Sequence, residues 1–370
     1  MIQSIIKTEN YDEELLYNTV CRHFEILEVE KDLNPEIRVV IKPNFVMACR
    51  PEMAATTHPM LIKAVVRWLK AHGIKNIIIA ESSGGLYTAE HLKKIYNVCG
   101  VAGLGFDEAL NFDTGSRSVN TQPGFANGSF NVINPICEAD YIINMPKIKT
   151  HGMVGFSCGM KNLFGVIPGL EKPQLHYRWP DIEDFSKMIF ELDRIIAPQI
   201  TLVDAVEGME GNGPTGGDKK YLGYTFAARD MYTQDWYIAG CIGLNQEDIV
   251  MLRQAKDAGF IKPEEIEIIG DKMEASVSFV LPDSKRLDFV DRVPGFLSRP
   301  AGFVMKKLLK SYPKVDTDLC VGCGKCAESC PPNIIKIKNK KAVFTRKGCI
   351  SCFCCQEMCP MKAISVKKAL

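Results

Sequence analysis

Apolar and polar positions alternate along the first 280 residues in a way that predicts strands and helices in turn. Residues 38–45 (RVVIKPNF) and 74–80 form apolar runs typical of buried strands. Between them, residues 59–72 place apolar side chains at helical spacing, with Thr57 or His58 as the cap and Pro59 in the first turn. This order of strand, helix and strand predicts a βαβ unit in a parallel sheet.

The same alternation continues toward the C-terminus. Three more strands and three more helices are predicted: strands 141–145, 200–206 and 266–269, and helices 181–196, 230–244 and 246–258. We therefore expect residues 1–283 to form an α/β domain with a mostly parallel sheet and helices on both faces. Residues 284–312 carry Pro, Lys and Arg, and we expect a linker with one amphipathic helix there.

Eight cysteines near the C-terminus form two copies of the spacing C-x2-C-x2-C-x3-C-P. This spacing is that of bacterial ferredoxins with two [4Fe–4S] clusters, in which the fourth Cys of each run ligates the other cluster. Zinc sites instead pair C-x2-C across a long gap, which disfavours zinc knuckles, and a disulfide scaffold is disfavoured as well. The predicted ligands are Cys320, Cys323, Cys326 and Cys359 for cluster 1, and Cys330, Cys349, Cys352 and Cys355 for cluster 2. Residues 313–370 should thus form a small α+β ferredoxin-like domain.

Composition limits the class of protein. Apolar content is 46%, charged content 24% and the net charge +1, so we expect neither a nucleic-acid partner nor a membrane span. The N-terminus lacks the pattern of a signal peptide. Oxygen-sensitive clusters beside scattered single Cys residues favour a reducing cytoplasm and anaerobic chemistry.

Charge is unevenly divided between the two domains. From Pro313 onward there are eleven Lys and Arg against four Asp and Glu, which leaves 34 basic and 40 acidic residues before it. Two interpretations stay open: the basic tail docks on its own acidic body, or its lysines form a solvated face.

Polar residues lie where the predicted strands end, which is where open α/β sheets bind ligands. Lysines there favour an anion, whereas carboxylates and His favour proton transfer or a metal. We expect Lys149 and Lys161 to hold an anion and His151 to handle protons. The expected substrate-binding residues are Lys42, Asn44, Glu81, Ser82, Lys147, Asn162, Asp204 and Glu207.

Each of these features also has a plainer interpretation. The Gly-rich segment 211–217 after the fourth strand is more often turn geometry than a phosphate cradle. A single His after a strand is more often structural, and Cys158 is more often a core thiol. Cys354, an extra Cys inside the second run, is not expected to ligate a cluster.

Five blocks also carry a family resemblance: KPNF, TTHP, AESSGG, MPKIKTHGMVGFSCGMKNLFGVIPG and LVDAVEGMEGNGPTGG. They resemble the recurring blocks of the uncharacterised family known as domain of unknown function 362, over roughly residues 35–270. That family often carries a two-cluster ferredoxin tail. The resemblance implies an iron–sulfur protein without an agreed substrate, and places Lys149, His151, Lys161, Asn162, Asp204 and Gly211 at typical family positions.

Three functions fit these features. The first is an iron–sulfur oxidoreductase that passes electrons to a small anionic substrate or cofactor. The alternative is a non-catalytic electron carrier or maturation protein that binds a metal, a nucleotide or a partner; a third is a non-redox isomerase-type site. The chain has neither GxGxxG after an early strand nor a P-loop, while a flavin or another metal stays open. The partner is thus an electron-transfer protein or a small molecule, and the sequence does not specify the oligomeric state.

Overall fold

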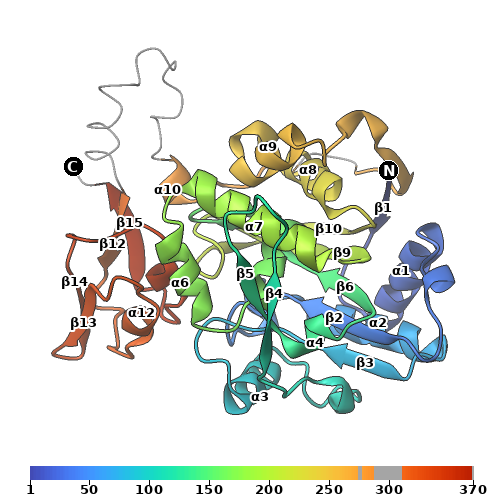
Figure 1. Ribbon diagram of the computed structural model, residues 1–370, viewed down its shortest axis with the longest axis horizontal. Helices are drawn as coiled ribbons and strands as arrows, with labels where there is room; N and C mark the ends of the chain where they lie inside the picture. The colour runs from blue at the N-terminus through green and yellow to red at the C-terminus, as the bar shows by residue number, and fades with distance from the viewer. Residues whose placement is uncertain (274–276, 287–310, 369–370) are drawn as a thin grey trace.

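The computed structural model describes residues 1–273, 277–286 and 311–368. The first two ranges form an α/β body around one nine-stranded sheet, whose main path runs β11-β1-β10-β9-β6-β2-β3 (Figure 1). β7 pairs with β9 and β8 with β7, beside that path. The strands are β1 Ile2–Lys7, β2 Arg38–Pro43, β3 Asn76–Ile79, β6 Tyr141–Met145, β7 Lys147–His151, β8 Gly155–Ser157, β9 Ile200–Glu210, β10 Asp218–Ala228 and β11 Glu267–Gly270.

The sheet is mixed but mostly parallel. Five of its eight strand pairs are parallel, including β3-β2, β2-β6 and β6-β9 at its centre. The antiparallel pairs are β9-β10, β1-β10 and β7-β8. The parallel centre is the part that the βαβ pattern predicts, and its strands point their carboxyl ends toward one edge.

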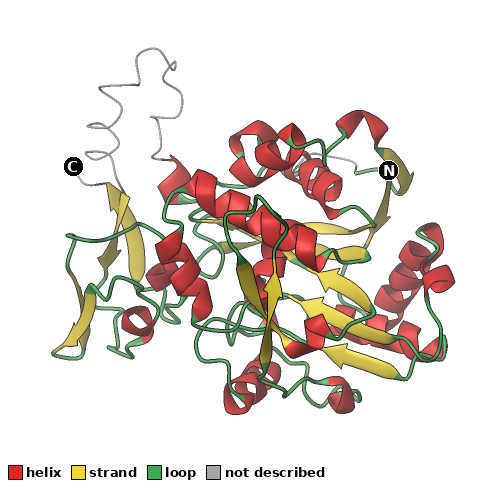
Figure 2. Cartoon of the chain, in the orientation of Figure 1, coloured by secondary structure: helices red, strands yellow, loops and turns green. Residues whose placement is uncertain are grey.

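Helices cover both faces of the sheet, as expected (Figure 2). Alternate strand residues point to opposite faces, so Val40 and Val203 join one core while Val39 and Leu202 join the other. The helices of the body are α1 Glu13–Ile26, α2 Pro59–Ala71, α3 Ala89–Val98, α4 Asn134–Cys137, α5 Gly159–Asn162, α6 Glu171–Arg178, α7 Ile182–Ile196, α8 Met231–Cys241, α9 Val250–Asp257 and α10 Asp283–Arg286. A separate hairpin joins β4 Ser116–Asn120 to β5 Ser129–Ile133.

Several predicted elements are confirmed, and helix α2 also begins at the predicted residue. Helix α2 begins at Pro59, and His58 is its cap, accepting a hydrogen bond from Met60 N. The prediction of one helix over residues 246–258 is wrong, because Ile249 is extended and separates a short 3-10 turn from α9. Strands β1, β7 and β10 were not predicted, and β9 runs four residues further than expected.

The C-terminal residues form a small module, called here the dicluster module (residues 311–368). Two antiparallel strand pairs, β12 Ser311–Val315 with β15 Ile364–Lys368 and β13 Ile335–Lys338 with β14 Lys341–Phe344, flank helices α12 Lys325–Glu328 and α13 Cys354–Glu357. Its first strand begins two residues before the predicted boundary. Most of the predicted linker, and the amphipathic helix expected in it, lie in residues 287–310, outside the described residues. In the described ranges no helix is both long and apolar enough to cross a bilayer.

Candidate electron-transfer and anion-binding site

The eight predicted ligand cysteines surround two separate hollows in the dicluster module. Cys320, Cys323, Cys326 and Cys359 line the first, and Cys330, Cys349, Cys352 and Cys355 line the second. Each set takes three thiols from one run and the fourth from the other. This is the crossed grouping that the spacing predicts.

The surroundings of the thiols suit iron–sulfur clusters. The remaining lining residues are mostly apolar, and three backbone amides donate to cysteine sulfurs: Ala342 N to Cys320 Sγ (3.4 Å), Ser351 N to Cys349 Sγ (3.4 Å) and Ala363 N to Cys359 Sγ (3.3 Å). Hydrogen bonds to the sulfurs and burial are the two features by which a protein tunes such clusters. Across the described ranges, no three His, Cys, Asp or Glu side chains are placed to hold a single metal ion.

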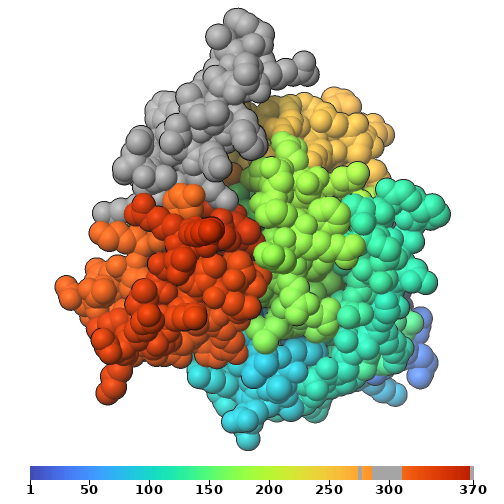
Figure 3. Space-filling view, turned by 60° about the vertical axis from the view of Figure 1, so that its left-hand side comes forward, coloured from blue at the N-terminus to red at the C-terminus, as the bar shows by residue number. Residues whose placement is uncertain are grey.

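The dicluster module packs against the body (Figure 3), and contacts at and directly after helix α13 join the two parts. Thr215 Oγ1 donates to Glu357 O (2.6 Å), and Lys362 Nζ donates to Gly217 O (3.1 Å). Met358 packs so close to Gly84 that a Cβ at that glycine would lie 2.5 Å from the Met358 sulfur. The body's contacts with the module are thus centred on the helix that carries Cys355, a predicted ligand of cluster 2.

The Gly-rich turn, residues 211–217, is part of this junction. It joins β9 to β10, and Gly213 lies so close to Thr150 O that a Cβ would meet it, while Asn212 Nδ2 donates to Asp283 (2.8 Å). Thr215 and Gly217 form hydrogen bonds with the dicluster module, so the turn has a structural role. This agrees with the interpretation of the segment as turn geometry and not as a phosphate cradle.

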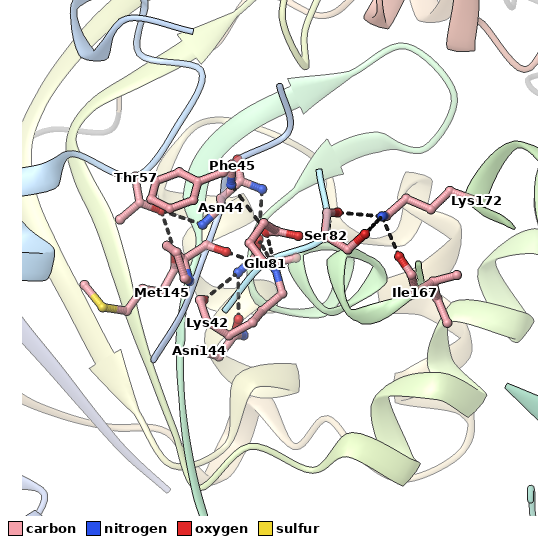
Figure 4. Close-up of polar contacts among 12 residues, drawn as sticks. Lys42, Asn44, Phe45, Thr57, Glu81, Ser82, Asn144, Met145, Ile167 and Lys172 are labelled. Atoms are coloured by element: carbon pink, nitrogen blue, oxygen red, sulfur yellow. Dashed lines mark hydrogen bonds and ion pairs between the residues drawn. The ribbon is translucent and has the colours of Figure 1, made fainter. Parts of the chain in front are cut away.

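Lys42 and Glu81 form a buried ion pair at the carboxyl ends of β2 and β3 (Figure 4). Their Nζ–Oε2 distance is 2.6 Å, and their side chains are 0% and 3% exposed. Asn162 Oδ1 accepts from both Lys42 (3.3 Å) and Asn44 (2.8 Å), which ties α5 to the end of β2. These four predicted site residues are therefore together.

A second buried ion pair joins β7 to β9. Lys147 Nζ lies 3.0 Å from Asp204, and Tyr11 bridges the pair, accepting from Lys147 (2.7 Å) and donating to Asp204 (2.9 Å). The fourth strand was expected to end at residue 206, with Glu207 beyond it, but β9 continues to Glu210, so Asp204 and Glu207 both lie within the strand; Glu207 pairs with Lys219 (2.8 Å) at the surface. Likewise Lys147, Lys149 and His151 lie in a strand of their own, β7.

Three other lysines at this edge, called here the unpaired lysines (Lys149, Lys161 and Lys172), have no carboxylate partner among the described residues. Lys149 is 1% exposed and donates to the neutral oxygens Asn44 Oδ1 (2.6 Å) and Ala55 O (2.7 Å). Lys161 Nζ lies 4.3 Å above the Phe164 ring. Lys172 donates to Ser82 O, Ser82 Oγ and Ile167 O (Figure 4).

Burial lowers the pKa of each unpaired lysine, to about 7 for Lys149 and Lys172. The negative charge of Glu357, on α13, opposes this shift at all three. Cys354 also acts on Lys161. The unpaired lysines therefore lie within electrostatic range of the helix that carries Cys355, and a bound anion would stabilise their protonated forms.

His151 is buried, 4% exposed, beside the same lysines. Its Nδ1 accepts a hydrogen bond from Met153 N (3.1 Å), which leaves the ring proton on Nε2. Burial first, and then the charge of Lys161, holds the pKa of His151 well below its usual value. The ring is thus neutral and offers Nε2–H as a donor until an anion raises its pKa.

Some residues of this region carry no sequence signal. Lys172 follows the fourth of the five family blocks by three residues, Tyr11 lies in an ordinary charged segment, and Glu357 lies among cysteines. Asp193 is fully buried, neither of its carboxylate oxygens has a hydrogen-bond partner in the described structure, and burial raises its pKa well above the usual value. Cys158 is 1% exposed, and burial raises its pKa as well, which fits a core thiol.

The geometry defines an α/β protein joined to a two-cluster ferredoxin module. The family model described as Domain of unknown function (DUF362) matches residues 39–240, and the one described as 4Fe-4S dicluster domain matches residues 312–360. The chain belongs to the DUF362 family. Its tail is a ferredoxin-type electron-transfer module, and a dicluster domain implies two [4Fe–4S] clusters.

Individual proteins are similar to this chain over parts of its length. The chain is 26% identical over 259 residues to the Thylakoid-associated protein sll1697 of Synechocystis sp., covering 66% of this chain and 76% of that protein. It is 48% identical over 29 residues to Ferredoxin-2 of Desulfomicrobium norvegicum, covering 8% of this chain and 49% of that protein. Among solved structures it resembles the lactate racemase apoprotein from Thermoanaerobacterium thermosaccharolyticum, with 16% identity and a TM-score of 0.38 over 63% of this chain and 57% of that one; a score this low carries no argument.

Proposed function

We propose that the protein is an iron–sulfur oxidoreductase that passes electrons to a small anionic substrate or cofactor held by Lys149 and Lys161. The main support for this proposal is the position of helix α13. It supplies Cys355 to the second hollow, while its Glu357 and Cys354 act electrostatically on the unpaired lysines. A cluster in that hollow would supply single electrons close to the unpaired lysines, which would bind the anion.

The residues divide into framework and binding groups. The ion pairs Lys42–Glu81 and Lys147–Asp204 neutralise their own charges and fix the strand ends. The unpaired lysines retain hydrogen-bonding capacity for a charged ligand, and a charge-assisted bond is about twice as strong as a neutral one. Lys161 is the most available, since its contacts are with aromatic rings.

His151 is the proposed proton-handling group. Reduction of an organic anion adds negative charge, and a proton generally follows. The neutral ring can donate Nε2–H to the bound anion. The bound anion raises the pKa of His151, and the ring is then reprotonated. Through their amide oxygens, Asn44 orients Lys149 and Asn162 orients Lys42. Because clusters of this kind are oxygen-sensitive, we also propose a reducing cytoplasm as the setting.

One observation favours the non-catalytic alternative of a carrier or maturation protein. Lys149 and His151 are 1% and 4% exposed when the module is docked, so a ligand there is enclosed. An enclosed ligand that never turns over would be a resident cofactor or cargo. The two functions differ in whether added small molecules consume electrons.

The test compares anaerobically purified wild-type protein with Lys149→Met/Lys161→Met and with the control Lys75→Met/Lys272→Met, two exposed body lysines. Native mass spectrometry should find an anionic small molecule on the wild type and the control, and lose it from the site variant while the iron content is unchanged. The proposal fails if the site variant retains that molecule or if none of the proteins carries one.

The second measurement addresses His151. In His151→Gln, dithionite should reduce the clusters as in wild type, but reoxidation by the anion identified above should be lost. Unchanged reoxidation would remove His151 from the reaction. A wild-type protein that binds the anion without any reoxidation would favour the carrier instead.

A further inference from the structure

The two hollows of the dicluster module differ in how their walls meet solvent. Val321, Ile337 and Met361 line the first hollow and are 56%, 37% and 43% exposed, and Cys323 is exposed beside them. We call these four residues the outer port. The second hollow is walled by seven apolar residues that are all buried or half-buried: Pro313, Pro332, Ile334, Ile335, Phe344, Ile350 and Phe353.

The second hollow has a cysteine on the helix that contacts the body, and the first hollow has Cys359 directly after Met358. The ligand residue Cys355 of the second hollow lies on α13, whose neighbours Gln356, Glu357 and Met358 meet the body. The outer port belongs to the first hollow, whose wall includes Ile337 and Ala342 of the β13–β14 hairpin. That hairpin lies at the end of the module away from the body (Figure 1). The same hairpin contributes Ile335 and Phe344 to the second hollow, so the two hollows differ in the exposure of their walls and not in their place on the hairpin.

The hairpin beside the port is basic. Strand alternation directs Ile337 toward the hollow and places Lys336 and Lys338 on the other face, where both are exposed. Lys340, also exposed, lies in the turn, and its carbonyl lies against Gly322 at the port. In the described structure none of these three lysines has an ion-pair partner.

The neighbouring side chains leave the three hairpin lysines without an ion pair in the described residues, and a cluster in the first hollow with its four thiolates would add negative charge beside them. Lys325 pairs with Glu328 (2.9 Å), and Lys341 Nζ donates to the carbonyls of Thr317 and Cys320. The acidic groups near the port are Asp316 and Asp318, and Asp316 accepts from the amides of Asp318 and Leu319. Across the described residues the module docks on the body without an ion pair; Lys362 donates to Gly217 O there, whereas no contact of the hairpin lysines Lys336, Lys338 and Lys340 with the body is seen in those residues.

We propose that the outer port is the docking surface for an acidic electron-transfer protein. An apolar centre with a charged rim is the usual anatomy of a specific interface, and a basic rim selects and steers a partner of opposite charge. One electron passes from the partner, which is oxidised, to the module, which is reduced; no covalent bond forms or breaks. The proposal does not depend on what the unpaired lysines of the body bind.

The experiment uses the full-length holoprotein and, as a probe, an acidic two-cluster ferredoxin reduced with dithionite. The variant Lys338→Glu/Lys340→Glu is compared with Lys75→Glu/Lys272→Glu, which changes the net charge equally on the body. At low ionic strength we expect the second-order rate of electron exchange to fall about tenfold in the hairpin variant and less than twofold in the control. The difference should disappear near 1 M salt, where the Debye length is about 3 Å.

Two further measurements separate the port from a general charge effect. Basic cytochrome c as oxidant should react no more slowly with the hairpin variant than with wild type. Val321→Ser, checked for unchanged iron content, should weaken binding to the immobilised acidic ferredoxin several-fold, because the contact loses apolar area. Equal losses in the hairpin and control variants, no loss in either, or full binding by Val321→Ser would overturn the proposal.

Discussion

Lys42 and Glu81 lie 2.6 Å apart as a fully desolvated ion pair, whereas Lys149, in strand β7, has only neutral oxygens as partners. Both lysines are buried at the carboxyl edge of the sheet, but only one is compensated by a carboxylate. This difference separates a structural lysine from one that is available for a ligand, and it makes separate predictions for the two positions.

Lys42→Met should destabilise the body strongly. It leaves the buried Glu81 carboxylate without its counter-charge, a loss of about 3–5 kcal/mol for a buried pair. Lys42→Met/Glu81→Gln should recover part of that loss, because no charge then remains buried. Urea unfolding of anaerobic protein measures both, and a cost below about 1 kcal/mol for the single variant would contradict the structural role.

Crossed ligation makes a prediction for the fourth Cys of each run. Intact protein should contain about eight irons and eight sulfides per chain, from two cubanes. Cys359→Ala should damage cluster 1, together with Cys320, Cys323 and Cys326, although Cys359 stands in the second run. Cys330→Ala should damage cluster 2. Iron analysis and electron paramagnetic resonance of each variant, compared with Cys326→Ser and Cys355→Ser, test this; Cys359→Ala resembling Cys355→Ser would show uncrossed ligation.

The unpaired lysines predict a pH dependence above neutrality. The folded pKa of Lys149 and Lys172 is about 7, below the unfolded value near 10.5, so between these values the folded protein binds fewer protons. The free energy of unfolding should therefore rise with pH over this window, by up to about 1.4 kcal/mol per pH unit for each lysine. Anion binding should weaken over the same window as the ammonium groups lose their protons.

Lys149→Met is the variant that checks this pH dependence. Denaturant unfolding between pH 7 and 10 should show a smaller slope of stability against pH than wild type, since one of the two titrating lysines is gone. The exposed Lys75→Met should keep the wild-type slope. Identical slopes for Lys149→Met and wild type would mean that Lys149 remains charged when buried.

Removal of iron should unfold the module and spare the body. The module's core contains few large side chains, chiefly Ile335 and Ile364, and the cysteines Cys326, Cys330 and Cys355 make up half of its buried residues. A module under sixty residues with so small a core usually needs metal to fold. Iron chelation followed by circular dichroism and limited proteolysis should leave a folded body; loss of both parts in one transition would contradict this.

The sequence alone predicted the grouping of the eight cysteines and the centre of the sheet. The grouping could be predicted because three cysteines of each set lie on one short loop, and the repeated spacing itself indicates that the fourth comes from the other run. The strand 141–145 and the helix beginning at Pro59 were predicted for the same reason, since their patterns and caps are local.

Only the tertiary structure decided what each lysine of the site does. Lys42, Lys147 and Lys149 look alike along the chain, and their difference comes from Glu81 and Asp204, which arrive from other strands. Lys172 and Glu357 joined the site without any sequence signal because they reach it across helices and across the junction between the two domains. Ion pairing and desolvation depend on which distant side chains meet, and a local pattern of residues does not contain that information.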